Sequence, residues 1–167
     1  MRIVVMADSH GGVNAVTKIV ERNIYTADAF IHLGDGENDT AGVLQEYPQI
    51  KLYQVRGNCD PSDAFPFMQV IDTVIGPNEK MVRILAVHGH LQGVERGTDE
   101  LVRLAHENDC EIVLFAHTHK RFDATEDGVL LINPGSCARP RDDEPPSYAY
   151  VDITEWGTIT GIVDLIE

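Results

Sequence analysis

The chain has 167 residues, enough for one domain with a sizeable core, and we expect residues 1–167 to form a single domain. Its 27 acidic residues outnumber 13 basic ones, and the formal net charge of −14 disfavours nonspecific binding of nucleic acid. The N-terminal apolar run ends before Asp8, far too early for a signal segment or a spanning helix, so we expect no membrane partner. Cys59, Cys110 and Cys137 form no CxxC motif, which favours reduced thiols and a cytoplasmic location.

The first third of the chain alternates between strand and helix patterns. A β-branched run over residues 3–7 predicts a strand, and apolar residues then recur at helical spacing, at Val13, Val16, Ile19 and Val20. Further strands are expected over residues 29–33 and 51–55, with a short helix over 40–47 between them. This βαβαβ order predicts a parallel sheet.

The middle of the chain predicts a hairpin, then another helix and strand. Residues 68–75 and 81–87 are β-prone, and the five residues between them, GPNEK, have the composition of a turn. A helix is expected over residues 98–107, capped by Thr98, and residues 111–115 return to a strand pattern.

The last part of the chain predicts strands without a helix. Three runs have the strand pattern, over residues 129–132, 147–153 and 158–166. Residues 134–146 are rich in Pro, Arg and Asp, which predicts an exposed loop. We therefore expect an all-β end to the domain.

Five polar clusters each follow an apolar run with the strand pattern. They are Asp8-Ser9-His10, Gly34-Asp35, Gly57-Asn58-Cys59-Asp60, His88-Gly89-His90 and His117-Thr118-His119. In open α/β sheets the loops beyond the carboxyl ends of the strands meet in one crevice, so clusters far apart in sequence can build one site. Asp, His and the Asn carbonyl oxygen are ligands suited to borderline divalent metals. About seven such ligands exceed the needs of one ion, whereas a bridging carboxylate would share them between two, so the count favours a binuclear centre.

Some histidines and carboxylates have simpler interpretations. His32 lies inside a strand run and is expected to pack in the core, and His106 lies near a helix end, where it would cap carbonyls or face solvent. Neither is counted as a ligand. Asp8 and His10 alone could form a local turn, and the HxH pair after residue 116 could be coincidence on a strand face. The recurrence of all five clusters favours metal ligation.

The motifs DxH, GD, GNxD, HGH and HxH, in this order, resemble those of the calcineurin-like metallophosphoesterase superfamily. The small size and the late segment Asn133-Pro134-Gly135-Ser136 are similar to its compact, single-domain phosphodiesterase branch. The resemblance implies an α/β fold in which two mixed β-sheets pack as a sandwich with helices on the outer faces, an αββα arrangement in four layers. It also implies a first metal ion held by Asp8, His10 and His119, a second held by Asn58, His88 and His117, and Asp35 as the bridge between them. The cofactors would be two divalent ions, with Mn²⁺ preferred and Fe, Ni, Co or Zn as alternatives.

The activity implied is hydrolysis of a phosphodiester bond in a small molecule by a hydroxide that bridges the two ions. Many relatives carry His where this chain has Cys59, so either activated leaving groups are preferred or another residue, such as His90, helps the leaving group depart. Asp60 would orient a ligand or its loop, and Asn58 would contribute both to metal binding and to catalysis. Ser9 and Ser136 lie in no GxSxG elbow and are expected in turns or hydrogen bonds rather than as nucleophiles.

Three other functions differ in how well the sequence supports them. A nuclease would need a capping domain or a basic groove, which neither the length nor the net charge supplies. A non-catalytic scaffold, like the retromer subunit with this fold, is disfavoured by the intact ligands, His10 and His117 among them. Hydrolysis of a monoester or a cyclic nucleotide would use the same ligands and stays open. We expect a small-molecule phosphate ester as the partner.

Two surface features leave more than one role open. Arg139 and Arg141 in the polar loop could bind phosphate oxygens or serve only as surface charge. The apolar segment Phe65-Pro66-Phe67-Met68 could pack on the hairpin or form an interface, and a homodimer is the oligomeric state we expect.

Overall fold

The first sheet is built around the parallel strands at the start of the chain. The computed structural model describes residues 1–166, and in it β1 (Arg2–Met6), β2 (Ala29–His32) and β3 (Leu52–Gln54) pair in parallel, as predicted. On its other side β1 pairs antiparallel with β9 (Ser147–Thr154), and β10 (Gly157–Asp164) forms the edge. Nearly all residues of β1 and β2 are buried because both faces of this sheet are covered.

The second sheet begins with the predicted hairpin. β4 (Met68–Ile75) and β5 (Lys80–Val87) pair antiparallel. β6 (Ile112–Leu114) and β8 (Val129–Pro134) continue the sheet in parallel with β5, and β7 (Arg121–Glu126) forms the far edge, antiparallel to β8. Both sheets therefore mix parallel and antiparallel pairs.

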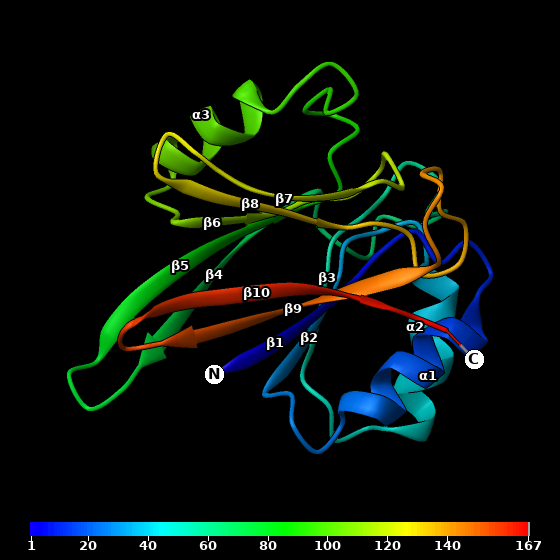
Figure 1. The fold of residues 1–167 in the computed structure, drawn as a ribbon. Coiled ribbons are helices and arrows are strands. Elements are labelled where there is room, and N and C mark those ends of the chain that lie inside the picture. Colours follow the sequence, from blue (N-terminus) through cyan, green and yellow to red (C-terminus); the bar gives the residue numbers. More distant parts are fainter. Residues whose placement is uncertain (167) are drawn as a thin grey trace.

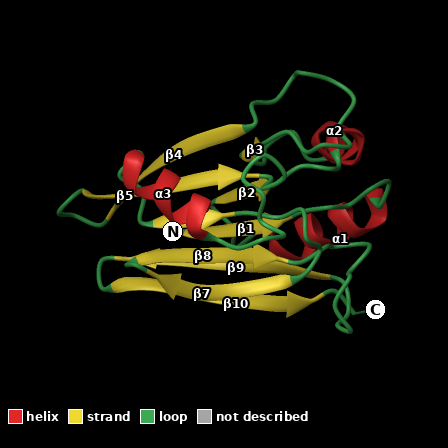
Figure 2. Ribbon diagram, turned by 90° about the horizontal axis from the view of Figure 1, so that it is seen from above, coloured by secondary structure: helices red, strands yellow, loops and turns green. Residues whose placement is uncertain are grey.

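The two sheets pack face to face, with helices on the two outer faces (Figure 1). Figure 2 shows one sheet lying over the other with the strands closely aligned. The apolar cluster between them includes Val5, Ile31 and Ile84. A second cluster joins the first sheet to α1 (Val13–Asn23) and α2 (Glu37–Glu46), and a third joins the second sheet to α3 (Asp99–Glu107). These three apolar layers confirm the predicted αββα sandwich.

The helices bury most of the residues that the helical spacing picks out, but Val13 at the start of α1 is exposed. Val16, Ile19 and Val20 of α1 and Leu101 and Ala105 of α3 face the sheets and are buried. No helix within residues 1–166 is long and apolar enough to cross a membrane.

One strand and one helix cap differ from the sequence-based expectations. The sequence predicts three strands after residue 120, whereas the structure has a fourth, β7, whose sequence RFDATE contains only two apolar residues because the strand lies at a sheet edge with little surface to bury. Thr98 is at the N-cap position of α3, but its hydroxyl makes no cap hydrogen bond. It donates instead to Glu126 Oε2 on β7, so it ties the helix to the sheet.

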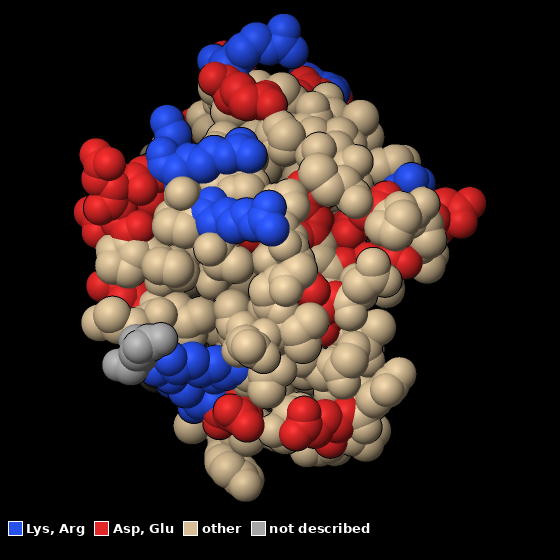
Figure 3. All heavy atoms as spheres, turned by 90° about the vertical axis from the view of Figure 1, so that its right-hand side faces the viewer, with Lys and Arg blue, Asp and Glu red and all other residues tan. Residues whose placement is uncertain are grey.

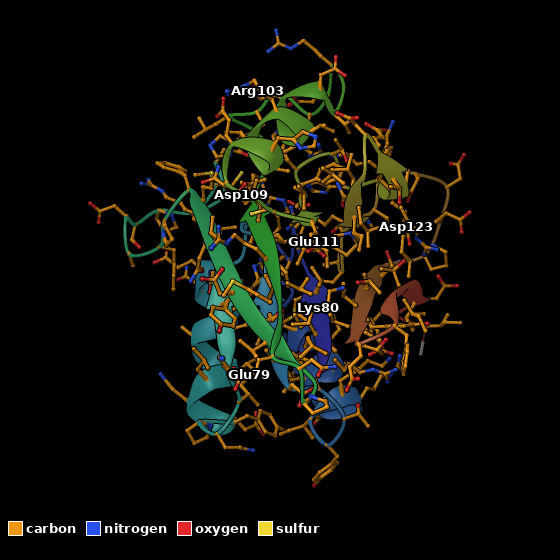
Figure 4. The ribbon with its side chains drawn as sticks, turned by 90° about the vertical axis from the view of Figure 1, so that its left-hand side faces the viewer. Glu79, Lys80, Arg103, Asp109, Glu111 and Asp123 are labelled. Carbon is orange, nitrogen blue, oxygen red and sulfur yellow. The ribbon has the colours of Figure 1, made fainter. Side chains whose placement is uncertain are left out.

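The two ends of the sandwich differ in character. Figure 4 looks onto the end away from the five polar clusters, where the charged side chains Glu79, Lys80, Asp109 and Glu111 point into solvent. At the opposite end, on the right in Figure 1, the loops after the parallel strands lie together. The candidate site lies in these loops.

Candidate metal centre

Each of the five polar clusters begins directly or one to three residues after a strand of one of the two sheets. Asp8 follows β1, Asp35 follows β2 and Asn58 follows β3, whereas His88 follows β5 and His117 follows β6. The loops converge as expected, because groups from both sheets approach within hydrogen-bonding distance of one another.

One group of ligand atoms joins the first, second and fifth clusters. The Nε2 atoms of His10 and His119 are 3.1 Å apart. Asp8 Oδ1 lies 3.5 Å from His119 Nε2, and Asp35 Oδ2 lies 3.5 Å from His10 Nε2. Asp8, His10 and His119 thus present three ligand atoms close enough for one metal ion.

A second group lies on the other side of Asp35. His88 Nε2 is 3.1 Å from Asn58 Oδ1 and 3.3 Å from His117 Nδ1. The same His88 nitrogen is 3.6 Å from Asp35 Oδ2, the carboxylate oxygen that also faces His10. Asp35 therefore lies between the two groups.

The outward nitrogens of two imidazoles are hydrogen-bonded to backbone carbonyls, which can only accept. His88 Nδ1 lies 2.7 Å from the carbonyl oxygen of Leu33, and His119 Nδ1 lies 2.7 Å from that of Arg139. Each of these nitrogens must donate a proton to its carbonyl, which leaves the inward Nε2 with a lone pair. The His119 lone pair faces Asp8 Oδ1 at 3.5 Å and the His88 lone pair faces Asp35 Oδ2 at 3.6 Å, an arrangement that suits a cation.

His117 is held in the same way by a carboxylate that the sequence does not single out. Its Nε2 donates to Glu95 Oε1 at 2.5 Å, so its Nδ1 lone pair faces His88. Glu95 is an exposed acid in an irregular loop, and no motif distinguishes it from the other acidic residues of the chain. Carboxylate partners of this kind raise the basicity of a ligating imidazole.

The Glu95→Gln variant is expected to lower the affinity for metal by about 10–100-fold without unfolding the protein, because the neutral amide polarises His117 less. Titration of the metal-free protein with Mn²⁺ measures this directly. Glu111→Gln, at the opposite end of the molecule (Figure 4), is the matched control and should bind metal like the parent. Equal affinity in all three proteins would remove Glu95 from the site.

The carboxylate of Asp8 lacks a partner that it needs. Asp8 is fully buried, and its Oδ2 accepts a hydrogen bond from the His117 backbone N–H, but its Oδ1 has no hydrogen-bond partner within residues 1–166. Burial and the nearby charge of Asp35 raise the pKa of Asp8 to about 8, and the charge of Arg141 only partly opposes them. A bound cation would satisfy this oxygen and stabilise the ionised form. The donor set of carboxylate, imidazole and amide oxygen fits a divalent metal.

The backbone at the site adopts a conformation that L-residues rarely take. Asp8, His10, Asp35, His117 and His119 all have positive φ, between 43° and 71°. Asn, Asp and His tolerate this region better than most residues, but each such position still costs about 1–3 kcal/mol. The sharp turns aim these side chains into the centre, and nothing in the sequence pattern reveals them.

Asp60 organises the loops rather than facing the ligand atoms. Its two oxygens accept backbone N–H bonds from Asp35, Gly36, Glu37 and Gly57, at 2.7–2.9 Å. Burial works to raise the pKa of Asp60, but these four donors outweigh it and hold the pKa below its usual value. The loops approach so closely that a Cβ at Gly57 would lie 2.0 Å from Asp35 Oδ1. Asp60 and Gly57 thus fix where Asp35 sits.

Two residues expected outside the site do lie outside it. His32 is fully buried, as predicted for a packed strand histidine, and burial lowers its pKa to about 4. Its Nε2 contacts Ser9 Oγ at 3.2 Å, and that hydroxyl donates to Asp39 Oδ2 at 2.5 Å, which is the hydrogen-bonding role expected for Ser9. His106 is exposed and pairs with Asp127 on the α3 side of the molecule.

His90 lies at the rim of the second group, whereas Cys59 Sγ lies within 4.8 Å of ligand atoms of His10 and Asp35. The His90 ring centroid is 5.3 Å from that of His88 and 5.7 Å from that of Phe67. Its Nδ1 is shielded from solvent and has no hydrogen-bond partner within residues 1–166, and burial, followed by the charge of His117, lowers the pKa of His90. Burial and a hydrogen bond with Asp35 raise the pKa of the Cys59 thiol to about 11.

The loop expected to be exposed over residues 134–146 is buried at its start. Gly135, Ser136 and Cys137 are buried because this segment packs against the end of β1, where Ser136 Oγ donates to the Asp8 carbonyl and Cys137 N–H donates to that of Ala7. Further along, Arg139 donates from Nη2 to the His10 carbonyl at 2.9 Å. The loop therefore braces the Asp8-Ser9-His10 turn.

The loops of this αββα sandwich gather imidazole and carboxylate groups from both sheets, an arrangement suited to divalent metal ions. The model of the calcineurin-like phosphoesterase superfamily domain matches residues 1–156. The chain belongs to this superfamily, and its fold implies divalent metal ions at the centre described above.

Similar proteins agree with this assignment. A probable metallophosphoesterase of Bacillus subtilis, YsnB, is 31% identical, with 92% of this chain and 85% of that protein covered. The phosphodiesterase YfcE of Escherichia coli K12 is 25% identical, with 91% and 88% covered. Among solved structures, a predicted phosphoesterase from Streptococcus pneumoniae TIGR4 has a TM-score of 0.81 at 29% identity, covering 98% of this chain and 88% of that one.

The fold is shared with proteins of another description. A single mutant of Vps29 from Entamoeba histolytica has a TM-score of 0.72 at 18% identity, covering 99% of this chain and all of that one. This similarity concerns the fold alone. The relatives named above make the chain a phosphoesterase of the metal-dependent kind.

Proposed function

We propose that this chain is a binuclear, metal-dependent phosphodiesterase that hydrolyses a small-molecule phosphodiester. The observation that carries the proposal is the convergence of imidazole lone pairs, fixed by outward hydrogen bonds, on the buried and unpartnered Oδ1 of Asp8. Bound cations would satisfy such a set of acceptors.

The two groups of ligand atoms give the proposed assignment. Asp8, His10 and His119 would hold one ion, Asn58, His88 and His117 the other, and Asp35, which faces both groups, would be shared. When bound, two divalent ions supply a water of near-neutral pKa as nucleophile and neutralise the phosphoryl oxygens. Mn²⁺ is our preferred metal, with Fe, Co, Ni or Zn as alternatives, because all suit this nitrogen and oxygen donor set.

Three residues of the chain would act on the substrate or orient the site. Asn58 Oδ1 faces His88, and its amide donates to Cys59 Sγ at 3.2 Å, which fixes the orientation of the amide. Asp60 would orient Asp35 through the backbone. His90, whose ring centroid lies 5.3 Å from that of His88, would deliver a proton to the departing oxygen.

The surroundings of the centre support the remaining parts of the proposal. Cys59, Cys110 and Cys137 are free thiols, which agrees with the proposed cytoplasmic location. Phe67 and Met68 are exposed beside His90, as an interface of the proposed homodimer would require. The partner would be a small phosphate ester rather than nucleic acid or membrane.

The proposal is tested by assaying metal-stripped protein on bis(4-nitrophenyl) phosphate and on 4-nitrophenyl phosphate, with and without Mn²⁺. We expect metal to restore activity on the diester and to bind at two ions per chain by calorimetry. Preference for the monoester would change the substrate class. Two bound ions without activity on either ester would favour a scaffold with this fold.

A further inference from the structure

A pocket of about 670 Å³ opens beside the metal centre. It lies between the loop before α3, the segment after β6 and the start of β7, and His117 forms part of its wall. Because His117 Nδ1 faces the ligand atoms of the centre, one molecule can occupy the centre and the pocket together. The volume is within the usual range of about 300–1,000 Å³ for ligand pockets.

The lining of this pocket has the opposite charge to the rest of the chain. Arg96, Lys120, Arg121 and Arg141 line it, and Glu95 is the single carboxylate in the lining. Glu95 is already paired with His117. The whole chain has 13 basic and 27 acidic residues, so four cations in one pocket reverse the general balance. Figure 3, which looks onto this end, shows Lys and Arg side chains grouped in its upper half.

Three of these cations are free to bind a ligand. Arg121 is engaged by Asp164 at 2.7 Å and by the Pro145 carbonyl at 2.8 Å. Within residues 1–166, Arg96, Lys120 and Arg141 form no ion pair. The backbone N–H of Arg141 donates to the His119 carbonyl at 3.0 Å, which fixes this residue next to the centre.

The floor of the pocket is apolar. Phe115 and Phe122 pack edge to face with ring centroids 5.7 Å apart, and buried Val94 lies beside them. A ligand that fits this lining combines an anionic group with a ring or another apolar body. A simple inorganic anion would leave the apolar part unfilled.

We propose that this pocket binds a second phosphate on the alcohol arm of the substrate, so that the natural substrate is a phosphodiester of a phosphorylated, ring-bearing alcohol such as a nucleoside phosphate. The inference rests on the proposed phosphodiesterase function, because it puts the scissile group at the metal centre. Arg96, Lys120 and Arg141 would contact the second phosphate, and the partly exposed Phe122 would contact the ring.

The test compares two substrates that differ only in that phosphate, thymidine 5′-(4-nitrophenyl phosphate) and its 3′-phosphorylated form. The Mn²⁺-loaded protein is expected to have a KM about tenfold lower for the phosphorylated form. In a Lys120→Ala, Arg141→Ala double variant the ratio of the two KM values should fall to near one. Lys80→Ala, an exposed cation at the opposite end (Figure 4), should keep the ratio. Equal KM values in the parent, or a ratio that the double variant keeps, would overturn the inference.

A binding measurement separates this inference from the proposed function. Calorimetric titration with thymidine 3′,5′-bisphosphate, with and without Mn²⁺, is expected to show about tenfold weaker binding to the double variant than to Lys80→Ala. If neither ester is hydrolysed but this difference in binding is found, the phosphodiesterase proposal fails and the pocket stands. If the esters are hydrolysed but the variants bind the bisphosphate equally, only the pocket inference fails.

Discussion

Replacing Asp8 with Asn is expected to abolish metal-dependent activity and, at the same time, to make the metal-free protein more stable. Loss of this carboxylate should lower activity by more than about 10²-fold, beyond the 10–100-fold typical of a lost outer partner of a metal ligand. The stabilisation follows from the unpartnered Oδ1 of Asp8. An amide nitrogen in its place can donate to the lone pair of His119 Nε2, 3.5 Å away, whereas the other position keeps its bond from His117 N–H.

The pH dependence of stability gives this prediction its sign. The pKa of Asp8 is about 8 in the folded state against an ordinary value of 3.8, so the folded state binds this proton more tightly than the unfolded state. The contribution of Asp8 to the free energy of unfolding is therefore lost as pH rises from about 4 to 8. His32 and His88 act in the opposite direction, because their pKa values are lowered from 6.5 to about 4, mainly by burial. These two histidines raise the free energy of unfolding as pH rises from about 4 to 6.5, and they do not change it above that pH. Of these three groups, only Asp8 then changes stability between pH 6.5 and 8.

Urea unfolding of the metal-free proteins at pH 6.5 and pH 8 measures the effect. The parent should lose stability over this range, and Asp8→Asn should be more stable at pH 8 by about 1–3 kcal/mol. Asp109→Asn, which removes an exposed carboxylate at the opposite end of the molecule (Figure 4), is the control and should behave like the parent. A variant that is less stable at pH 8, or that still binds two ions, would contradict the role given to Asp8.

The Cys59→His variant is expected to accelerate the hydrolysis of diesters with poor leaving groups by about 10–100-fold, toward the range typical of general acid catalysis. The thiol, with its pKa raised to about 11, is a weak proton donor near neutrality, whereas an imidazole titrates close to it. The backbone N–H of Cys59 donates to Asp35 Oδ1 at 2.7 Å, a bond that any residue here can make. The substitution therefore keeps this backbone bond, but it removes the sulfur to which the Asn58 amide donates.

The measurement is kcat/KM over a series of phenyl and alkyl diesters whose leaving groups differ in pKa. The dependence on leaving-group pKa should become shallower in Cys59→His, with little change for 4-nitrophenolate, which departs without a proton. Cys59→Ala should keep the slope of the parent. A uniform gain across the series would instead indicate a change in metal binding.

The convergence of the five polar clusters could be predicted from the sequence because each cluster follows an apolar strand run at its carboxyl end. Parallel pairing then brings Asp8, Asp35 and Asn58 to one edge, and His88 and His117 reach the same place from the second sheet. The relation between the two sheets cannot be read from periodicity, because the pattern gives strands and faces but not which faces meet. The motif resemblance supplies that relation.

Other features carry no local signal. Glu95 acts through a single hydrogen bond across 22 residues, and acidic residues are common in this chain. The sequence leaves Arg141 with two roles, phosphate binding or surface charge, and its position beside His119 and β7 follows only from the tertiary packing. β7 is missed because an edge strand needs few apolar residues. These features depend on tertiary contacts, which propensity does not encode.

The left-handed backbone at Asp8, His10, Asp35, His117 and His119 also limits which substitutions these positions accept. Asp, Asn, His and Gly tolerate that conformation, whereas a β-branched or bulky residue there would distort the turn. Substitution of Asp8 by Asn, or of His10 by Gly, would therefore abolish the activity while leaving the fold intact. Loss of the reaction is within reach of single substitutions, and a lineage can keep this architecture for another purpose after the hydrolase has gone.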